Sequence, residues 1–398
     1  MDAEVKRDGK GRGPTGASER SAVDPFLAMD VLAEATRLEG EGRSIVHMEV
    51  GQPGAPAPKA VLDAAREALA GPLGYTEALG RAPLRERIAR HYAETYGVEV
   101  SPGNVIVTTG SSAGFMLAFL AGFDAGQRIA LPSPGYPAYR NILKALDLIP
   151  VEIETTAETR WALTPEHLEQ VSRDGPIAGV LVASPANPTG TMMEPDALEA
   201  LIRKAEELGM WFISDEIYHG LVYEGRRAAS ALETSPDAIV VNSFSKYYCM
   251  TGWRVGWMIV PDRLVRPVER LAQNLYISVP DLSQRAALAA FDAREELEAV
   301  RAVYAQNRAL LRSRLPELGF ETILPADGAF YLYADITPFA DDSVAFSRAL
   351  LQEAGVAVTP GPDFDPVGGH RFVRFSLAGQ HAAMVEGMER LAHHLGRS

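Results

Sequence analysis

The sequence predicts an α/β protein with a mostly parallel sheet that is covered by helices on both faces, followed by a smaller α+β unit. Three observations predict this class. Short β-branched runs alternate with longer amphipathic stretches between about residues 83 and 276, a long glycine-free stretch follows, and two further apolar runs occur near the C-terminus. Strands that alternate with helices need crossover connections, and these place helices on the faces of a parallel sheet.

Six short apolar runs are the predicted strands of the large sheet. They are residues 105–109, 129–131, 179–183, 210–214, 238–242 and 255–260. The predicted helices between them are residues 83–96, 113–123, 138–146, 195–208 and 262–276. In the first of these helices Leu84, Ile88 and Tyr92 recur four residues apart, which gives the helix one apolar face.

Four segments are expected along the chain. Residues 1–24 are rich in glycine and charge and are predicted to be disordered. Residues 25–50, with an apolar helical pattern at 25–38, are expected to join a small domain, and residues 51–290 form the large domain. A long helix over 282–315 then leads into the small C-terminal domain, residues 291–398, with strands at 329–334 and 372–375.

The composition excludes several classes of protein. The net charge is −14, which argues against nucleic acid or an anionic membrane surface as the main partner. No run of about 18 apolar residues is present, so no membrane span is expected. The N-terminus lacks the apolar stretch of a secretory signal, and Cys249 is the single cysteine, so no intrachain disulfide is possible. These features favour a cytoplasmic protein.

Two short motifs suggest other functions. Residues 11–16 match the G-x-G-x-x-G pattern of dinucleotide-binding proteins, but they lie in a polar tail with no strand before them. Residues 110–114 match the G-x-S-x-G pattern of α/β-hydrolases, with a predicted strand before and a helix after. Ser112 would be the nucleophile of such a hydrolase. The same turn can instead bind a phosphate through backbone N–H groups at a helix N-terminus.

Polar residues follow several predicted strands. Asn187 follows the run at 179–183, Asp215 and Tyr218 follow the run at 210–214, and Lys246 follows the run at 238–242, with Arg254 eight residues further on. The carboxyl ends of parallel strands meet at one edge of a sheet. We therefore expect these side chains to converge on one crevice.

Each of these residue types suits the chemistry of pyridoxal 5′-phosphate (PLP). A lysine amine can condense with the aldehyde of PLP and act as a base, provided that burial or a cationic neighbour such as Arg254 lowers its pKa. A carboxylate such as Asp215 can keep the pyridine nitrogen protonated, so that the ring accepts electrons. Asn187 and Tyr218 can donate hydrogen bonds to the ring oxygen.

The chain from about residue 25 to the end closely resembles the class I/II, aspartate-aminotransferase-like enzymes of PLP fold type I. The resemblance rests on motifs that occur in the order of that family. They are Gly51-Gln52-Pro53, Tyr75-Thr76, Thr109-Gly110-Ser111-Ser112-Ala113, Pro134-Gly135-Tyr136-Pro137, Asn187-Pro188-Thr189-Gly190, Asp215-Glu216-Ile217-Tyr218, Ser243-Phe244-Ser245-Lys246, Arg254 and Arg374-Phe375-Ser376. The family's fold has a mostly parallel seven-stranded sheet in the large domain.

The resemblance implies a role for each matching residue. Lys246 is implied to form the Schiff base with PLP and to act as the base. Asp215 is implied to pair with the pyridine nitrogen, and Tyr218 is implied to donate a hydrogen bond to the ring oxygen. The other implied cofactor contacts are Asn187 at the ring oxygen, Tyr136 on the ring face, and Ser111, Ser112, Ala113, Ser243 and Arg254 at the phosphate. Tyr75 is implied to reach the phosphate of the other subunit of a homodimer, and Gly51, Asn187 and Arg374 to contact the substrate.

The resemblance implies a PLP-dependent aminotransferase that moves the α-amino group from an amino acid to a 2-oxo acid by a ping-pong mechanism. A β-lyase of the cystathionine type is the nearest alternative, because it needs few additional residues after removal of the α-proton. A serine hydrolase using Ser112 is a weaker alternative. The sequence does not predict the side chain of the substrate. Several arginines, such as Arg20, Arg43 and Arg285, could each bind a second carboxylate on the substrate.

Overall fold

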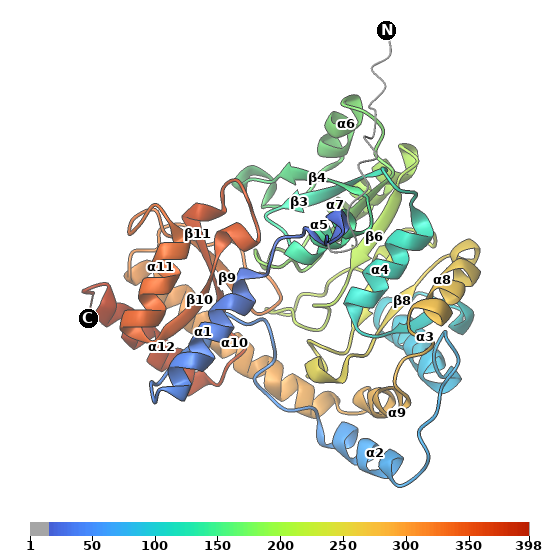
Figure 1. The fold of residues 1–398 in the computed structure, drawn as a ribbon, viewed down its shortest axis with the longest axis horizontal. Helices are drawn as coiled ribbons and strands as arrows, with labels where there is room; N and C mark the ends of the chain where they lie inside the picture. The colour runs from blue at the N-terminus through green and yellow to red at the C-terminus, as the bar shows by residue number, and fades with distance from the viewer. Residues whose placement is uncertain (1–15, 398) are drawn as a thin grey trace.

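The computed structural model describes residues 16–397 and consists of two sheets with their covering helices (Figure 1). Residues 1–15, which hold most of the extension predicted to be disordered and nearly all of the G-x-G-x-x-G match, lie outside the described residues. The described part of the extension contains a short 3-10 helix, Glu19–Ser21.

The large sheet has seven strands in the order β2-β8-β7-β6-β5-β3-β4. Their bounds are β2 Val105–Thr108, β3 Arg128–Ser133, β4 Ile149–Glu154, β5 Gly179–Ala183, β6 Trp211–Asp215, β7 Ile239–Ser243 and β8 Gly256–Ile259. Only β8 runs antiparallel to its neighbours. The expected fold class, a mostly parallel seven-stranded sheet, is confirmed.

The strand β4 is absent from the six predicted strands. It lies at the edge of the sheet, pairs only with β3, and carries Pro150 and several exposed residues. An edge strand can hold a proline and polar side chains because one of its sides has no partner strand. Its sequence therefore lacks the continuous apolar run of a central strand.

The large sheet is covered by helices whose positions agree with the predicted helical stretches. Their bounds are α3 Ala82–Tyr96, α4 Ser111–Gly122, α5 Pro137–Ala145, α6 Pro165–Arg173, α7 Pro195–Glu207 and α8 Asp262–Leu275, with α2 Lys59–Leu69 and α9 Asp281–Ala290 packed against each other at one end. Of the sheet-covering helices, α6 is the one that was not predicted from the sequence.

The prediction of a single helix over residues 282–315 is wrong. The stretch forms two helices, α9 and α10 (Arg294–Glu317), with a break at residues 291–293 between them. Phe291 lies in this break and packs edge-on against Phe244 with ring centroids 5.4 Å apart. The guanidinium carbon of Arg87 lies 4.4 Å from the centre of the same ring. These tertiary contacts, and not a glycine or proline, accompany the end of α9.

The small sheet joins segments from both ends of the chain. Its strands follow the order β1-β10-β11-β9, with bounds β1 Val46–Met48, β9 Tyr331–Asp335, β10 Val356–Pro360 and β11 Phe372–Ser376. The N-terminal β1 pairs in parallel with β10. The helices α1 (Leu27–Gly40), α11 (Ser343–Ala349) and α12 (His381–His394) lie around it, and α10 runs from the small sheet toward α9 (Figure 1).

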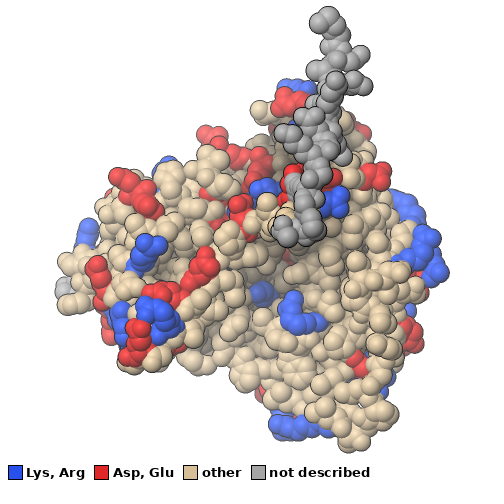
Figure 2. Space-filling model, in the orientation of Figure 1, with Lys and Arg blue, Asp and Glu red and all other residues tan. Residues whose placement is uncertain are grey.

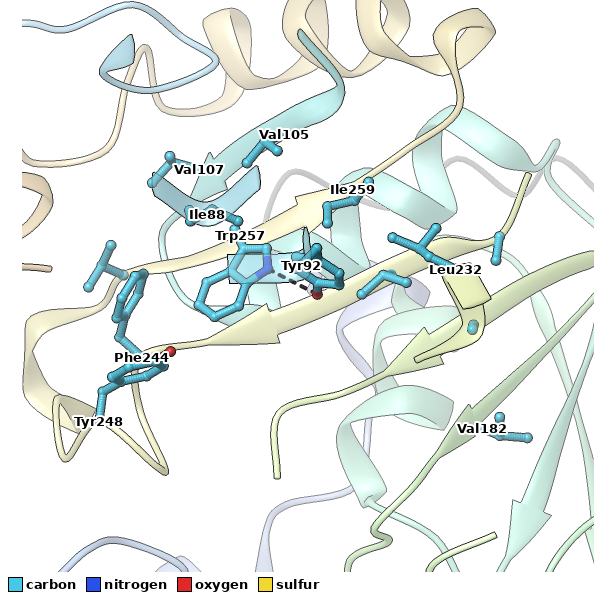
Figure 3. Close-up of a cluster of buried hydrophobic side chains, with 14 of the residues drawn as sticks. Ile88, Tyr92, Val105, Val107, Val182, Leu232, Phe244, Tyr248, Trp257 and Ile259 are labelled. Carbon is cyan, nitrogen blue, oxygen red and sulfur yellow. Dashed lines mark hydrogen bonds between the residues drawn. The ribbon is translucent and has the colours of Figure 1, made fainter. Parts of the chain in front are cut away.

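An aromatic cluster supports the end of β7 and the turn that follows it (Figure 3). Trp257 of β8 is fully buried and donates its Nε1–H to the hydroxyl of Tyr92, 3.3 Å away. Phe244 and Tyr248 pack against the indole of Trp257 with centroid distances of 4.9 and 6.4 Å. Lys246 lies between these two aromatic residues in sequence, so the cluster fixes the turn that presents it.

No helix within residues 16–397 is both long enough and apolar enough to cross a lipid bilayer.

Candidate active site

The carboxyl ends of β5, β6 and β7 open into a cavity of about 300 Å³ between the two sheets. Asp215 is the last residue of β6, Asn187 follows β5, and Lys246 follows β7 by three residues. Arg254 and Arg374 line the same cavity. Figure 2 shows a hollow with basic side chains inside it between the two parts of the molecule. The predicted convergence of these side chains is confirmed.

Lys246 presents its amine to the cavity in a desolvated environment. The Nζ donates a hydrogen bond to the carbonyl oxygen of Gly51. Burial, together with the positive charges of Arg374 and Arg254, lowers the pKa of Lys246 to about 8, and the carboxylate of Asp215 opposes this shift. The uncharged amine, which is the form that acts as a nucleophile or base, is therefore much more abundant near neutral pH than it is for an ordinary lysine.

Asp215 is 3% exposed and is held on both oxygens. Its Oδ1 accepts the backbone N–H of Ile217 at 3.0 Å, and its Oδ2 accepts the hydroxyl of Tyr139. Burial raises the pKa of Asp215 to about 6, and these two hydrogen bonds together with Lys246 oppose the rise. Tyr139 was missed in the sequence analysis. Its spacing of three residues from Tyr136, at the start of α5, was the available signal.

The Gly110–Arg254 cradle, a glycine turn beside a guanidinium, lies at one end of the cavity. Gly110 has φ +76°, and a Cβ on it would lie 2.3 Å from Nη2 of Arg254, so only glycine allows this approach. Ser111 is the first residue of α4 and lines the cavity with Ser112. The first N–H groups of a helix have no acceptor within the helix, so those of Ser111, Ser112 and Ala113 can bind an anion beside the guanidinium.

Two residues expected at the phosphate are placed differently. Ser245, and not Ser243, lines the cavity, and the Ser243 hydroxyl lies 2.8 Å from that of Ser245 and 3.1 Å from the Val255 carbonyl oxygen. Tyr75 is 84% exposed and does not line the cavity of its own chain. Ser243 therefore reaches the cavity only through its hydrogen bond with Ser245. Tyr75 could contact only the cavity of a second subunit.

Arg374 is rigidly held at the other end of the cavity. It is 4% exposed, and its guanidinium carbon lies 4.3 Å from the ring centre of Tyr331 and 4.7 Å from that of Phe364. Its Nη1 donates to Oδ1 of Asn187 at 2.9 Å, and Nη2 donates to Thr359 and to the Glu49 carbonyl oxygen. Its buried Nε has no hydrogen-bond partner within the described residues. A guanidinium held in this way suits a carboxylate.

The side of the cavity between these ends carries hydroxyl and aromatic groups. The hydroxyls of Tyr218 and Tyr331 are 2.9 Å apart, and burial raises the pKa of Tyr218 well above its ordinary value. The ring of Tyr136 lines the cavity, and burial raises the pKa of its hydroxyl to about 12. A Cβ on Gly51 would lie 1.9 Å from the Tyr331 hydroxyl, so glycine is required there. Tyr331 was also missed in the sequence analysis.

This donor set fits PLP. A buried amine of lowered pKa matches the aldehyde, a buried carboxylate matches the pyridine nitrogen, and the Gly110–Arg254 cradle matches the phosphate. A serine hydrolase using Ser112 would need a histidine within reach, and within residues 16–397 no histidine lines this cavity. The fold and the site thus define a PLP-dependent enzyme of fold type I.

Comparisons with known proteins identify the family. The sequence model of class I and II aminotransferases matches residues 43–391. The valine–pyruvate aminotransferase of Mycobacterium tuberculosis is 49% identical over 377 residues, covering 94% of this chain and 96% of the relative. The aspartate/prephenate aminotransferase of Thermus thermophilus is 34% identical, covering 96% of this chain and 100% of the relative. A crystal structure of an aminotransferase from Mycobacterium tuberculosis superposes with a TM-score of 0.94 at 47% identity, covering 96% of this chain and 100% of the other.

The chain belongs to the class I and II aminotransferase family. It is a PLP-dependent aminotransferase, and this conclusion is favoured over the β-lyase and the serine hydrolase because full-length relatives at up to 49% identity are aminotransferases.

Proposed function

We propose that this aminotransferase uses Lys246 to move the proton at the α-carbon and Arg374 to hold the α-carboxylate of an amino acid or 2-oxo acid. The observation that carries the proposal is that both side chains face one cavity, together with Asp215 and the Gly110–Arg254 cradle. The two charged ends fix the orientation of a flat ligand between them, so that its reacting carbon faces the amine.

Bound PLP supplies a ring that withdraws electrons from the α-carbon and so stabilises the negative charge left by proton removal. Lys246 would accept this proton from the α-carbon and return it at the other end of the three-atom unit that would join the α-carbon to the cofactor. Its lowered pKa, about 8, suits both steps because a base and an acid of similar strength are needed in turn. Repeating the steps in reverse with a second acid gives a ping-pong exchange.

Asp215 keeps the pyridine nitrogen protonated in this proposal. Tyr139 and the Ile217 N–H hold the carboxylate in place, and both hydrogen bonds favour its ionised form. An ionised carboxylate beside the nitrogen favours the positive ring on which electron withdrawal depends. Tyr139 is thus a positioning residue that acts through Asp215.

Tyr218 and Asn187 are proposed donors to the ring oxygen. The Oδ1 of Asn187 accepts from Arg374, which leaves the amide hydrogens of Asn187 to face the ligand. Tyr136 is proposed to lie on the face of the ring, where an aromatic contact needs only a flat surface. Gly51 contributes a backbone carbonyl beside the substrate, where it now accepts from Lys246.

Phosphate binding is assigned to the start of α4 and to Arg254. The N–H groups of Ser111, Ser112 and Ala113 supply donors without charge, and Arg254 supplies the cation. Ser243 supports this contact through its hydrogen bond with Ser245.

A homodimer is also proposed. Several exposed large apolar side chains gather on two neighbouring segments, 69–75 and 275–277, and they include Leu73, Tyr75 and Ile277. The N–H of Thr76 bonds to the hydroxyl of Ser278 at 3.2 Å, so the two segments lie side by side. An apolar patch of this kind on an otherwise charged protein marks an interface. It would place Tyr75 at the phosphate of the partner subunit.

Light scattering of the purified protein tests the homodimer, with Ile277→Asp expected to give monomers of reduced PLP affinity. A wild-type protein that is monomeric at micromolar concentration contradicts it. We also propose a cytoplasmic location, which the buried single thiol of Cys249 supports because no disulfide is needed for the fold.

The roles are tested by half-reactions on purified, PLP-loaded protein. An amino acid should convert the visible absorbance of lysine-bound PLP to that of the amine form, and a 2-oxo acid should restore it with release of a new amino acid. The β-lyase alternative predicts pyruvate and ammonia from cystathionine without any 2-oxo acid. Release of ammonia without amino transfer would therefore overturn the proposal.

A further inference from the structure

We propose that the cavity selects amino acids and 2-oxo acids whose side chains are apolar and uncharged, and that Asp363 enforces this choice by excluding a second carboxylate. The inference rests on the proposed function, because it requires Arg374 to hold the α-carboxylate. The substrate side chain then points from the reacting carbon toward the remaining wall of the cavity, and the chemistry of that wall decides which side chains are accepted.

The remaining wall comes from the start of α1 and from the segment before β11. Phe26, Ala28 and Met29 line it from α1, and Phe364 lines it from the other side. The ring of Phe26 lies 5.9 Å from that of Tyr136, centre to centre. Phe364 stacks near the guanidinium of Arg374, as described above. A side chain that leaves the α-carbon between Tyr136 and Arg374 therefore meets carbon atoms on both sides.

Asp363 adds one negative charge to this wall. It lines the cavity, is 3% exposed, and accepts the N–H groups of Leu27 and Ala28 at 3.1 and 3.2 Å, one on each carboxylate oxygen. Burial raises its pKa, while these two donors and the neighbouring Arg374 and Arg140 oppose the rise. The carboxylate thus occupies the positive N-terminus of α1.

The start of α1 has no N–H group left for a second anion. The first two N–H groups are bound by Asp363, and those of Met29 and Asp30 are bound by the carbonyl oxygen of Phe26 at 3.0 and 3.3 Å. A helix N-terminus can bind a carboxylate only through such free donors. A distal carboxylate of a substrate would therefore meet a like charge and no hydrogen-bond donor from this helix.

The cations that line the cavity are already assigned. Within residues 16–397 they are Lys246, Arg254 and Arg374, which serve proton transfer, the phosphate and the α-carboxylate. Of the arginines that the sequence left open, Arg285 is paired with Asp281 at 2.9 Å. Arg20 lies 3.5 Å from Asp147, and Arg43 donates to backbone carbonyls near residue 352. None of the three lines the cavity of its own chain.

The charge of Asp363 and the apolar wall both favour an apolar substrate side chain over a carboxylate. A carboxylate brought beside the carboxylate of Asp363, away from water, is repelled more strongly than it would be in solution. An apolar side chain of the same size gains contact with Phe26, Met29 and Phe364. Unfavourable contacts against the wrong ligand commonly contribute as much to specificity as favourable contacts with the right one.

Leucine, asparagine and aspartate test the inference because their side chains are nearly equal in shape. Rates of the first half-reaction with each donor give kcat/KM for the loaded enzyme. We expect leucine to exceed aspartate by on the order of 10²-fold, with asparagine between them. Aspartate equal to or faster than leucine would overturn the inference while leaving the proposed function intact. Failure of every donor would instead overturn the proposed function itself.

The variant Asp363→Asn removes the charge and keeps one acceptor for the start of α1. We expect it to narrow the leucine-to-aspartate ratio by about 10-fold or more. Asp342→Asn is the matched control, because Asp342 also accepts two helix N–H groups, those of Val344 and Ala345, but lies outside the cavity. This control should leave the ratio unchanged. An unchanged ratio in Asp363→Asn, with the same thermal stability as the control, would contradict the role of Asp363.

Binding provides a readout that needs no turnover. The acids 4-methylpentanoate and succinate match leucine and aspartate without their amino groups. Calorimetry should show tighter binding of 4-methylpentanoate to the wild type, and Asp363→Asn should tighten succinate more than it affects 4-methylpentanoate. Tighter succinate binding to the wild type would show that the cavity supplies a second cation, and the inference would then be wrong.

Discussion

The hydroxyl of Tyr139 donates a hydrogen bond to the buried carboxylate of Asp215. Tyr139 is on α5 and Asp215 ends β6, so this bond joins a helix to the centre of the sheet below the cavity. It favours the ionised carboxylate against the effect of burial, which raises the pKa of Asp215. In the proposed function, the electronic state of the cofactor therefore depends on Tyr139 through its bond to Asp215.

Removing this hydroxyl should weaken cofactor binding and slow catalysis. Tyr139→Phe loses a hydrogen bond to a charged group, which is worth about 1.5–3 kcal/mol. We expect PLP affinity to fall about 10-fold or more, and the pH at which lysine-bound PLP changes colour to shift. Tyr223→Phe is the control, because the Tyr223 hydroxyl is buried and bonds a backbone carbonyl outside the cavity. Equal effects in both variants would show a structural role only.

Replacing Lys246 should remove both the covalent attachment and the base. Lys246→Ala is expected to lower kcat/KM on the order of 10⁴-fold, because a positioned base contributes up to that factor. After borohydride reduction, mass spectrometry should find PLP on the peptide with Lys246 in the wild type and nowhere in the variant. Lys204→Ala, which alters a surface lysine paired with Glu169 and Glu207, should behave as the wild type. Normal turnover by Lys246→Ala would exclude the assignment.

Replacing Arg374 should separate binding from chemistry. Arg374→Lys keeps the positive charge but loses the planar pair of donors that can bind both oxygens of a carboxylate. The weaker buried contact with the carboxylate should lower kcat/KM about 10²-fold, chiefly through a higher KM. Arg308→Lys is the control, because Arg308 is also buried and bonds Glu224 and a backbone carbonyl outside the cavity. The control should lower thermal stability without raising KM. A normal KM in Arg374→Lys would place the α-carboxylate elsewhere.

The stability of the PLP-free protein should depend on the ionisation of Asp215. Its pKa is raised from 3.8 to about 6, so the folded state holds a proton more tightly than the unfolded state. The favourable contribution is present below about pH 4 and is lost as the pH rises through about 6. The asparagine of Asp215→Asn does not titrate. The free energy of unfolding of this variant, relative to that of the wild type, should therefore rise between about pH 4 and pH 6, by up to about 3 kcal/mol. A difference independent of pH in urea unfolding would contradict this prediction.

The order of motifs in the sequence was sufficient to predict the fold class and most residues of the site. Central parallel strands are buried on both faces, so their β-branched runs are continuous, and the polar residues that follow them mark the carboxyl edge of the sheet. Lys246, Asp215 and Asn187 were predicted in this way, and Arg254 was predicted from its position eight residues after Lys246. The roles that the family resemblance implied for them remain proposals about chemistry.

Other features required the tertiary structure. The short strands β1 and β10 pair with each other from opposite ends of the chain, and the edge strand β4 depends on its pairing with β3. The break after α9 depends on packing around Phe291. Tyr139 and Tyr331 contribute hydroxyls to the site from elements whose local sequence also suits an ordinary core. Periodicity reports which face of an element is buried, but not which buried groups meet.

The sequence by itself determined the alternation of strands and helices and the chemical types available at the sheet edge, because both follow from local spacing along the chain. Only the tertiary structure decided that Asp363 binds the start of α1 beside Arg374, since residues 27 and 363 are brought together by the pairing of β1 with β10. The proposed choice of substrate side chain depends on that long-range contact, because charge repulsion acts through space and not along the sequence.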